Sequence, residues 1–279
     1  MVSDGVQQEN AMAGEGVGCA PPAFLWKLWI YTNYDCNLRC SYCVAKSSPN
    51  APRRGLGLGL ANVKQLVDEA VELGFSDLFF TGGEPFILAN IYEMLAYASA
   101  RVRTTVLTNA MILQGKRIDQ LCAVANENLI IQVSLDGGRA EDHDAYRGAG
   151  AWAKTVDGIK LLQERGFRVR LSTTETPANQ ARLDQVCEFH RGLGIPDEDH
   201  FIRPLAKRGY AKEGLELNMN NLLPEVTANL DGIFWHPLST DMDMQVSKKL
   251  FPLSTAVLRI QQQLAAIAAT GSTALMTFT

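Results

Sequence analysis

Hydrophobic residues in the middle of the chain follow two alternating periods. Residues 26–32 are aromatic and β-branched, which is typical of a strand. Between residues 60 and 71 the apolar positions recur every three to four residues, the period of an amphipathic helix. A short apolar strand at 78–80 follows Gly74, which is a plausible helix stop. The pattern therefore predicts a strand, a helix and a second strand.

The same order of elements recurs as far as residue 203. We expect helices at 60–71, 91–100, 118–125, 156–164 and 183–193. We expect strands at 26–32, 78–80, 104–107, 129–134, 168–173 and 200–203. Strands that alternate with helices form parallel βαβ units, because a parallel pair needs a crossover and the helix covers the sheet. The fold class is therefore α/β.

Polar motifs follow each of the first four strands. In a parallel sheet these ends share one edge, and contributions from so many consecutive strands favour a curved sheet over a single crevice in an open sheet. The sequence therefore predicts a partial (β/α)6 barrel that is open on one side.

Both ends of the chain differ from this array. Residues 1–22 are rich in Gly, Ala, Gln and Glu, and we expect a flexible N-terminal arm there. The barrel is expected to cover residues 23–208. Residues 209–279 are interrupted by Gly and Pro until a predicted helix from Ser254 to Ala269, and we expect this region to form a C-terminal helical cap over the barrel opening.

Composition and charge are ordinary for a globular protein. Hydrophobic residues make up 47% of the chain, charged residues make up 20%, and the net charge is -4. This charge argues against broad electrostatic binding to nucleic acid. No stretch reaches the roughly 18 apolar residues of a spanning helix, and no secretory signal is evident. We therefore expect a cytoplasmic protein with neither a nucleic-acid nor a membrane partner.

Cysteine usage points to metal chemistry. The chain has six cysteines, which are Cys19, Cys36, Cys40, Cys43, Cys122 and Cys187. Three of them form a C-x3-C-x2-C pattern on the loop after the first strand. In a reducing compartment such crowding favours metal binding over disulfides.

Several metal sites suit three close thiolates. A zinc site would need a distant fourth ligand, and no second C-x2-C pair exists. A ferredoxin-type cluster would need a fourth thiolate from Cys122 or Cys187, which both fall in predicted helices as small buried hydrophobes. Three thiolates on a four-iron cluster would instead leave one iron open, as catalysis by a metal centre requires.

The segment from Asp35 to Cys43 resembles the cluster loop of the radical S-adenosylmethionine (SAM) superfamily, including the aromatic Tyr42 before the last cysteine. Residues 81–85, Thr-Gly-Gly-Glu-Pro, resemble the glycine-rich element after the family's second strand. Further similarity to its peptide-modifying and molybdopterin-type branches lies at residues 134–137, 143–144 and 146–148. The resemblance covers residues 26–205.

This resemblance implies two cofactors, a [4Fe-4S] cluster on Cys36, Cys40 and Cys43, and S-adenosylmethionine. It implies that the amino and carboxylate groups of S-adenosylmethionine chelate the open iron. One electron, expected from reduced flavodoxin or ferredoxin, would then cleave the sulfonium to methionine and a 5′-deoxyadenosyl radical, which abstracts hydrogen from the substrate.

Five candidate cofactor-binding residues follow the second and fourth strands. Gly82 and Gly83 let the backbone approach a ligand closely, although such a pair also forms a plain tight turn. Glu84 adds a negative charge near the cofactor's ammonium. Ser134 and Asp136 alternate along the strand end, so they point to one side, and they suit ribose hydroxyls unless they merely cap the strand.

Four more candidates belong to the same rim. Thr108 and Asn109 end the third strand where the family usually has a Thr-Asn-Gly turn, but Ala110 replaces the glycine. Arg203 ends the sixth strand and reaches either the cofactor, the substrate or a surface salt bridge. Arg147 either neutralises a carboxylate at the site or pairs with an acidic residue of its own segment. The sequence identifies no catalytic residue.

The sequence thus predicts a single-cluster radical SAM enzyme that abstracts hydrogen from a small-molecule biosynthetic intermediate or a peptide. Only Cys187 follows Cys122, so we expect no cysteine-rich C-terminal extension for further clusters. An alternative is a maturase whose peptide or protein substrate is presented by a partner. A non-enzyme alternative is an electron-transfer iron–sulfur protein, but that function would not need the glycine-rich element together with Ser134 and Asp136.

Overall fold

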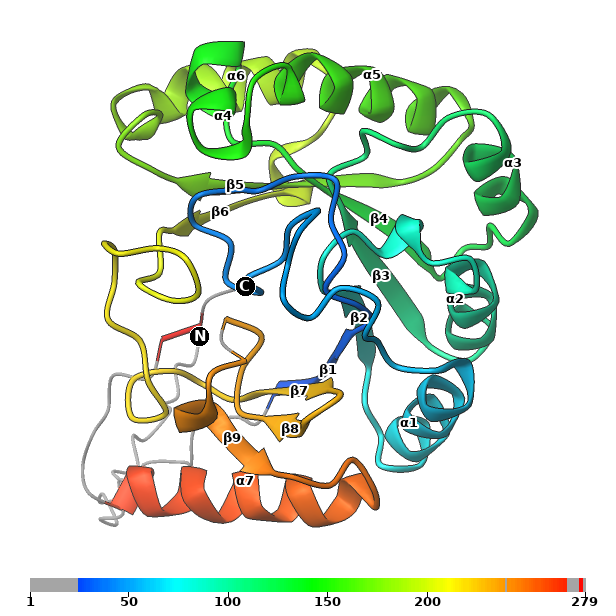
Figure 1. Ribbon diagram of the computed structural model, residues 1–279, viewed down its shortest axis with the longest axis vertical. Helices are drawn as coiled ribbons and strands as arrows, with labels where there is room; N and C mark the ends of the chain where they lie inside the picture. Colours follow the sequence, from blue (N-terminus) through cyan, green and yellow to red (C-terminus); the bar gives the residue numbers. More distant parts are fainter. Residues whose placement is uncertain (1–24, 239, 270–275, 278–279) are drawn as a thin grey trace, which may run out of the picture.

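A curved sheet with helices on its outer face dominates the computed structural model (Figure 1), which describes residues 25–238, 240–269 and 276–277. The predicted arm at residues 1–22, with Cys19, lies outside the described residues. The strands are β1 (Leu25–Tyr31), β2 (Asp77–Thr81), β3 (Arg103–Thr108), β4 (Leu129–Ser134), β5 (Val169–Glu175), β6 (His200–Pro204), β7 (Glu225–Asn229), β8 (Gly232–Phe234) and β9 (Gln245–Ser247). The α-helices are α1 (Leu60–Glu72), α2 (Ile91–Ser99), α3 (Lys116–Ala123), α4 (Ala140–Arg147), α5 (Ala151–Glu164), α6 (Leu183–Gly192) and α7 (Leu253–Ala269).

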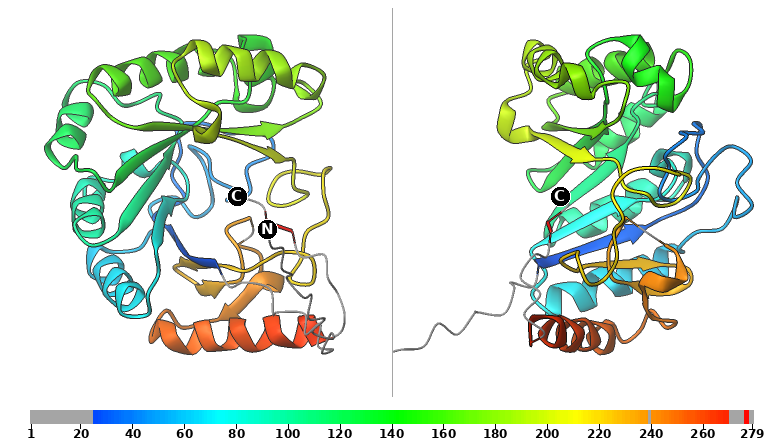
Figure 2. Two further views of the ribbon diagram at one scale, coloured as in Figure 1. Left: turned by 180° about the vertical axis from the view of Figure 1, so that it is seen from behind. Right: turned by 90° about the vertical axis from the view of Figure 1, so that its left-hand side faces the viewer.

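The first six strands confirm the predicted βα array. They lie side by side in chain order, and each neighbouring pair is parallel. Figures 1 and 2 show the sheet bending into an incomplete barrel, with α1 to α6 around its convex side. Helix α4 was not predicted. Its buried residues are polar or charged, namely Asp142, His143 and Arg147, so it lacks the apolar stripe from which helices are recognised.

The C-terminal region differs from the expected helical cap. Strand β7 pairs in parallel with the free edge of β1, and the antiparallel β8 and β9 extend the same sheet. The predicted helix is present as α7, which packs beside α1 and β9. Strand β7 was not predicted from the sequence, because three of its buried residues are polar and a buried strand is recognised by apolar residues. These residues are Glu225, Thr227 and Asn229, which are fully buried. The division of the chain near residue 208 stays a prediction.

Side chains of the strands alternate between two environments. Leu28, Ile30, Phe80 and Ile131 point outward into the main hydrophobic core beneath the helices. The alternate positions of β1, from Lys27 to Tyr31, point into the barrel, where they line cavities. The outer layer therefore stabilises the fold and leaves the barrel interior for binding.

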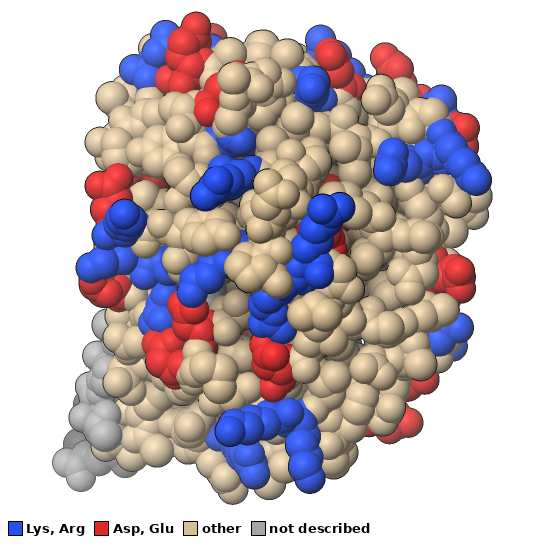
Figure 3. All heavy atoms as spheres, in the orientation of Figure 1, with Lys and Arg blue, Asp and Glu red and all other residues tan. Residues whose placement is uncertain are grey.

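A long segment between β1 and α1, residues 32–59, crosses the rim formed by the C-terminal ends of the strands (Figure 2). We call it the cysteine loop, because it carries Cys36, Cys40 and Cys43. Over the face seen in Figure 1, basic and acidic side chains are interspersed (Figure 3). Within the described residues, no helix is long and apolar enough to cross a lipid bilayer.

Replacing Leu66 by Ala tests the outer core. Leu66 is 0% exposed on α1, whereas Val71 on the same helix is 41% exposed. We expect Leu66→Ala to lower the free energy of unfolding by about 2–5 kcal/mol, because it leaves a cavity. Val71→Ala should cost less than about 1 kcal/mol. Urea unfolding followed by far-ultraviolet circular dichroism measures both, and equal losses would contradict this packing.

Candidate active site

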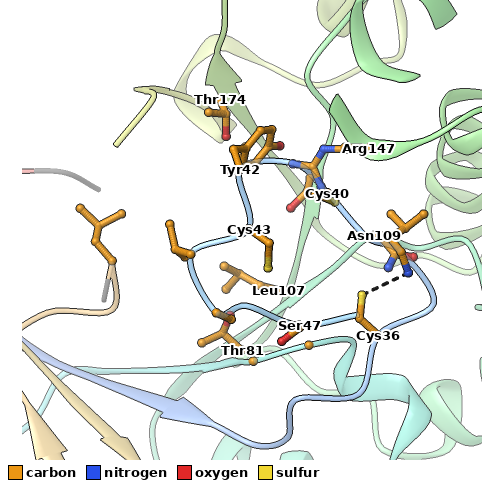
Figure 4. A pocket seen from close by; sticks show the side chains of 18 of the residues that line it. Cys36, Cys40, Tyr42, Cys43, Ser47, Thr81, Leu107, Asn109, Arg147 and Thr174 are labelled. Carbon is orange, nitrogen blue, oxygen red and sulfur yellow. Dashed lines mark hydrogen bonds between the residues drawn. The ribbon is translucent and has the colours of Figure 1, made fainter. Parts of the chain in front are cut away.

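A cavity of about 190 Å³ lies between the cysteine loop and the C-terminal strand ends (Figure 4). It brings together all the sequence-predicted site residues except Glu84 and Asp136. These lining residues are Cys36, Cys40, Cys43, Gly82, Gly83, Thr108, Asn109, Ser134 and Arg203. We call this space the cysteine cavity. In Figure 4 the sulfur atoms of Cys36 and Cys43 point into it.

The three cysteines are partly buried. Burial raises the pKa of Cys36 to about 12 and that of Cys40 to about 11, and it also raises the pKa of Cys43. The protein alone therefore keeps these cysteines protonated at neutral pH. Because the thiolate is the metal ligand, loading of a metal centre must release protons from them.

Asp136 lies behind the wall of the cavity instead of facing it. Its carboxylate accepts hydrogen bonds from the Tyr42 hydroxyl (2.5 Å), Arg147 Nε (2.6 Å) and the Thr174 amide (2.9 Å). Burial alone would raise the pKa of Asp136, but the Arg147 guanidinium lowers it below its usual value. The carboxylate thus fixes Tyr42, next to Cys43, and its contact with ribose hydroxyls stays a prediction.

The same geometry decides the role of Arg147. Its guanidinium pairs with the Asp136 carboxylate, and a second contact joins Nη2 to Oδ1 at 3.2 Å. The two acidic residues expected as local partners are engaged elsewhere: Asp144 accepts from the amides of Gly150 and Trp152, and Glu141 pairs with Arg139. Arg147 also lines the cysteine cavity, so one side chain both holds the loop and offers positive charge to a ligand.

Glu84 is also turned away from the cavity. It is 0% exposed and accepts hydrogen bonds from the Phe86 amide (3.2 Å), the Thr108 hydroxyl (2.8 Å) and the Asn109 amide (2.9 Å). Burial raises its pKa to about 7. The carboxyl group of Glu84 links the turn after β2 to the end of β3, and its place near the cofactor's ammonium stays a prediction.

Gly82 and Gly83 line the cavity, and close backbone contacts also require glycine at both positions. A Cβ on Gly83 would lie 2.0 Å from the Asp35 carbonyl oxygen, and one on Gly82 would lie 2.4 Å from that of Asn33. The Gly83 amide donates to the Asn33 carbonyl oxygen at 2.9 Å, and the Glu84 amide donates to the Asp35 carbonyl oxygen at 2.7 Å. The glycines therefore let the cysteine loop rest directly on the turn after β2.

The departure from a Thr-Asn-Gly turn is accommodated locally. Ala110 has a positive φ of 59°, so it adopts the conformation that glycine would take more easily. Asn109 donates to the Asn37 side-chain oxygen at 2.9 Å, which ties this turn to the cysteine loop. Sequence reasoning missed Asn37, and its only signal was its position directly after Cys36.

The remaining candidates divide between the rim and the outer layer. Ser134 and Arg203 both line the cysteine cavity, and Arg203 donates to the Ser172 hydroxyl. Cys122 on α3 and Cys187 on α6 do not line it. Among the residues that the structure describes, no three His, Cys, Asp or Glu side chains form a site for a single metal ion.

Residues 30–178, which run from β1 and the cysteine loop past β5, match the radical SAM superfamily. The chain belongs to the radical SAM superfamily. Its members are enzymes that use a [4Fe-4S] cluster and S-adenosylmethionine. The match includes all three clustered cysteines and all the other candidate site residues except Arg203, which lies on β6.

Three curated relatives are similar to part of the chain. The AdoMet-dependent heme synthase of Methanosarcina barkeri is 31% identical over 177 residues, 63% of this chain and 48% of that protein. The subtilosin biosynthesis protein AlbA of Bacillus subtilis is 32% identical over 58% of this chain and 36% of its own. The mycofactocin maturase MftC of Mycolicibacterium smegmatis is 30% identical over 66% and 45%. The aligned region thus spans less than half the length of each relative.

Solved structures support the fold. SuiB of Streptococcus suis bound to S-adenosylmethionine has a TM-score of 0.59 at 18% identity, covering 71% of this chain and 45% of its own. The enzyme anSMEcpe with bound AdoMet has a TM-score of 0.63 at 12% identity, covering 85% of this chain and 82% of its own. Both confirm that this radical SAM chain forms a partial barrel.

The residues present fit a four-iron cluster. Three thiols line one cavity from separate points of its wall, and neither Cys122 nor Cys187 lines it. Three thiolates without a fourth leave one iron open to a chelating ligand. The neighbouring backbone of Gly82 and Gly83 and the guanidinium of Arg203 offer polar partners for such a ligand.

Replacing Gly83 by Ala tests the contact between the cysteine loop and the turn after β2. The new Cβ would clash with the Asp35 carbonyl, so the loop must shift. We expect iron affinity after anaerobic reconstitution to fall by about 10-fold or more. Gly59→Ala is the matched control, because a Cβ there meets nothing within 4 Å. Full iron content in Gly83→Ala would refute the proposed contact.

The raised pKa of Glu84 predicts a dependence of stability on pH. A carboxyl whose folded-state pKa of about 7 exceeds its usual value contributes stability below the unfolded pKa, and loses it as pH rises through the folded pKa. Relative to Glu84→Gln, the wild-type free energy of unfolding should fall by up to about 3 kcal/mol between about pH 4.5 and pH 7. Urea midpoints at several pH values measure this. Glu93→Gln, on the exposed side of α2, is the control.

Proposed function

We propose that this chain uses a [4Fe-4S] cluster on Cys36, Cys40 and Cys43 to cleave S-adenosylmethionine and abstract hydrogen from a peptide. The observation that carries the proposal is the convergence of three thiols and the polar strand ends in one cavity. When bound, the cluster and S-adenosylmethionine would supply one-electron chemistry that ends in a 5′-deoxyadenosyl radical. The chain's own residues would bind and orient these two cofactors and shield the radical from water.

The wall of the cysteine cavity supplies complementary groups for S-adenosylmethionine. The backbone around Gly82 and Gly83 suits its ammonium, and Ser134 and Thr108 suit its ribose hydroxyls. Arg147 and Arg203 bring positive charge suited to a carboxylate. Glu84 and Asp136 are positioning residues in this proposal, since they hold the turn and the loop from behind.

Exclusion of water is the second contribution of the chain. Apolar side chains from β1, β3 and the segment after β6 line the cavity, namely Tyr31, Leu107 and Leu205. Tyr31 and Leu205 are 2% and 8% exposed. A reactive radical needs such surroundings, because water and stray donors of hydrogen must be kept away.

The choice of a peptide rests on the relatives. AlbA is named for the biosynthesis of a bacteriocin, and MftC is named as a maturase. The heme synthase favours the second candidate, a small-molecule biosynthetic intermediate. A reduced flavodoxin or ferredoxin as electron donor, and presentation of the peptide by a partner, belong to the proposal.

Replacing Cys36, Cys40 and Cys43 together by Ala tests the cluster. Anaerobically reconstituted protein with dithionite and S-adenosylmethionine should form 5′-deoxyadenosine, measured by liquid chromatography, and the triple variant should form none while binding little iron and sulfide. Cys122→Ala and Cys187→Ala should behave like wild type, because neither residue lines the cavity. An intact cluster that leaves S-adenosylmethionine uncleaved would refute the proposed chemistry.

A further inference from the structure

A second cavity lies deeper in the barrel, toward the N-terminal ends of the strands. It measures about 180 Å³, and its lining includes inward-facing residues of β1, β2, β4 and β5, such as Lys27, Phe79, Gln132 and Arg170. We call it the lower chamber. Its cationic rim opens to solvent, since the Arg103 side chain is 54% exposed. None of the site residues predicted from the sequence faces it except Arg203.

The lower chamber has an unusual lining for a barrel interior. Barrels built from parallel strands are normally filled by branched apolar side chains. Here Lys27, Asp77 and Arg103 form a charged row in register across β1, β2 and β3. Charged groups at inward positions cost free energy unless they are paired or serve a ligand.

Three of the four cations that line the chamber are paired with carboxylates. These ion pairs are Lys27 with Glu225, Arg103 with Asp77, and Arg170 with Asp199. The fourth cation, Arg203, makes no ion pair among the described residues, and its one side-chain hydrogen bond there goes to Ser172. Among the described residues, Arg203 is therefore the cation of this lining that no carboxylate contacts directly, and the more distant Glu225 and Asp136 carboxylates act to raise its pKa.

Arg203 stands where the two cavities meet. It lines the cysteine cavity, the lower chamber and a smaller cavity of about 70 Å³ beside Pro237. Burial lowers the pKa of Arg203, because taking the charged guanidinium out of water is unfavourable. A bound anion would offset that cost, and a group held by Arg203 would lie next to the space lined by the cysteines.

Gln132 adds an independent sign of a ligand. Its side chain lines the lower chamber and the residue is only 5% exposed, yet its amide makes no hydrogen bond to the described part of the chain. The amide atoms of Gln132 are not among the fully enclosed polar atoms that lack a partner, so they face the space of the chamber. Both its N–H donors and its oxygen are therefore available to a polar ligand group.

An aromatic wall completes the chamber. The rings of Trp29 and Phe79 stack with centroids 4.3 Å apart and an interplanar angle of 17°. The Trp29 indole donates to the Glu225 carboxylate at 2.6 Å, which fixes the ring. Such a rigid surface favours the flat or apolar part of a ligand.

We propose that the lower chamber binds a monocarboxylate group of the substrate. Arg203 pairs with the carboxylate, Gln132 bonds a neighbouring polar group, and Trp29 with Phe79 covers the apolar part. Assignment of this ligand as the substrate rests on the proposed function, whereas carboxylate binding itself does not. The carboxylate of S-adenosylmethionine is the other possible source, and it would reach Arg203 from the cysteine cavity without using Gln132.

The test uses 4-fluorophenylacetate as a probe, followed by fluorine NMR on the reconstituted, cluster-loaded protein. We expect saturable binding, and at least about 10-fold weaker binding of the neutral 4-fluorophenylacetamide, because the charge-assisted pair is lost. Arg203→Gln and Gln132→Glu should each weaken binding of the acid by at least about 10-fold. Arg203→Lys, which keeps the charge, should retain most of it.

Arg191→Gln is the matched control, since Arg191 is an exposed arginine of α6 paired with Asp197. It should bind the probe like wild type, and circular dichroism should show that every variant is folded. No binding to wild type, equal binding of acid and amide, or undiminished binding in Arg203→Gln would overturn the proposal. So would stoichiometric displacement of the probe by S-adenosylmethionine. Formation of 5′-deoxyadenosine without substrate is measured in parallel, so failure of the radical chemistry is distinguished from failure of carboxylate binding.

Discussion

The cysteine loop must be held in place without a helix or strand of its own, and the whole site depends on how this is achieved. Residues 32–59 carry all three cavity cysteines, so their backbone groups need partners elsewhere. Two buried carboxylates supply the anchors. Asp136 fixes Tyr42 within the loop, and Glu84 fixes the turn on which Asn33 and Asp35 rest. Removing one partner from such a buried network lowers the free energy of unfolding by more than the interaction itself contributes, because it leaves a buried polar group unpaired.

Local sequence pattern explains most of the barrel. Strand β4 has the predicted bounds, and each predicted helix overlaps an observed one, because these elements bury regular apolar stripes. The cysteine spacing and the glycine pair likewise identified the cavity. Contacts between residues that are far apart in the chain could not be predicted from local pattern. Tyr42 and Asp136 are 94 positions apart, so no local pattern indicated that this carboxylate bonds to the cysteine loop. Strand β7 was missed because its buried residues are polar, and their partners are also distant in the chain.

The barrel interior separates two kinds of chemistry along its axis. The upper level, around the cysteines, combines thiols, backbone and apolar side chains, and it suits a centre that must be kept from water. The lower level carries paired charges and a stacked aromatic wall, which suit recognition of a polar molecule. Arg203 belongs to both levels. In the proposed function, a substrate held in the lower chamber would approach the level of the cysteines beside Arg203.

The segment after β6 couples the open side of the barrel to the metal-binding loop. The Tyr210 amide donates to the Cys43 carbonyl at 3.1 Å, and its hydroxyl donates to that of Lys46 at 2.9 Å. A Cβ on Gly209 would lie 2.2 Å from the Cys43 oxygen, so the two backbones are in direct contact. Lys46 in turn pairs with Asp241, between β8 and β9. The segments that connect the strands beyond β6 thus support the third cysteine and the residues that follow it, on the side where the six-stranded array alone would be open.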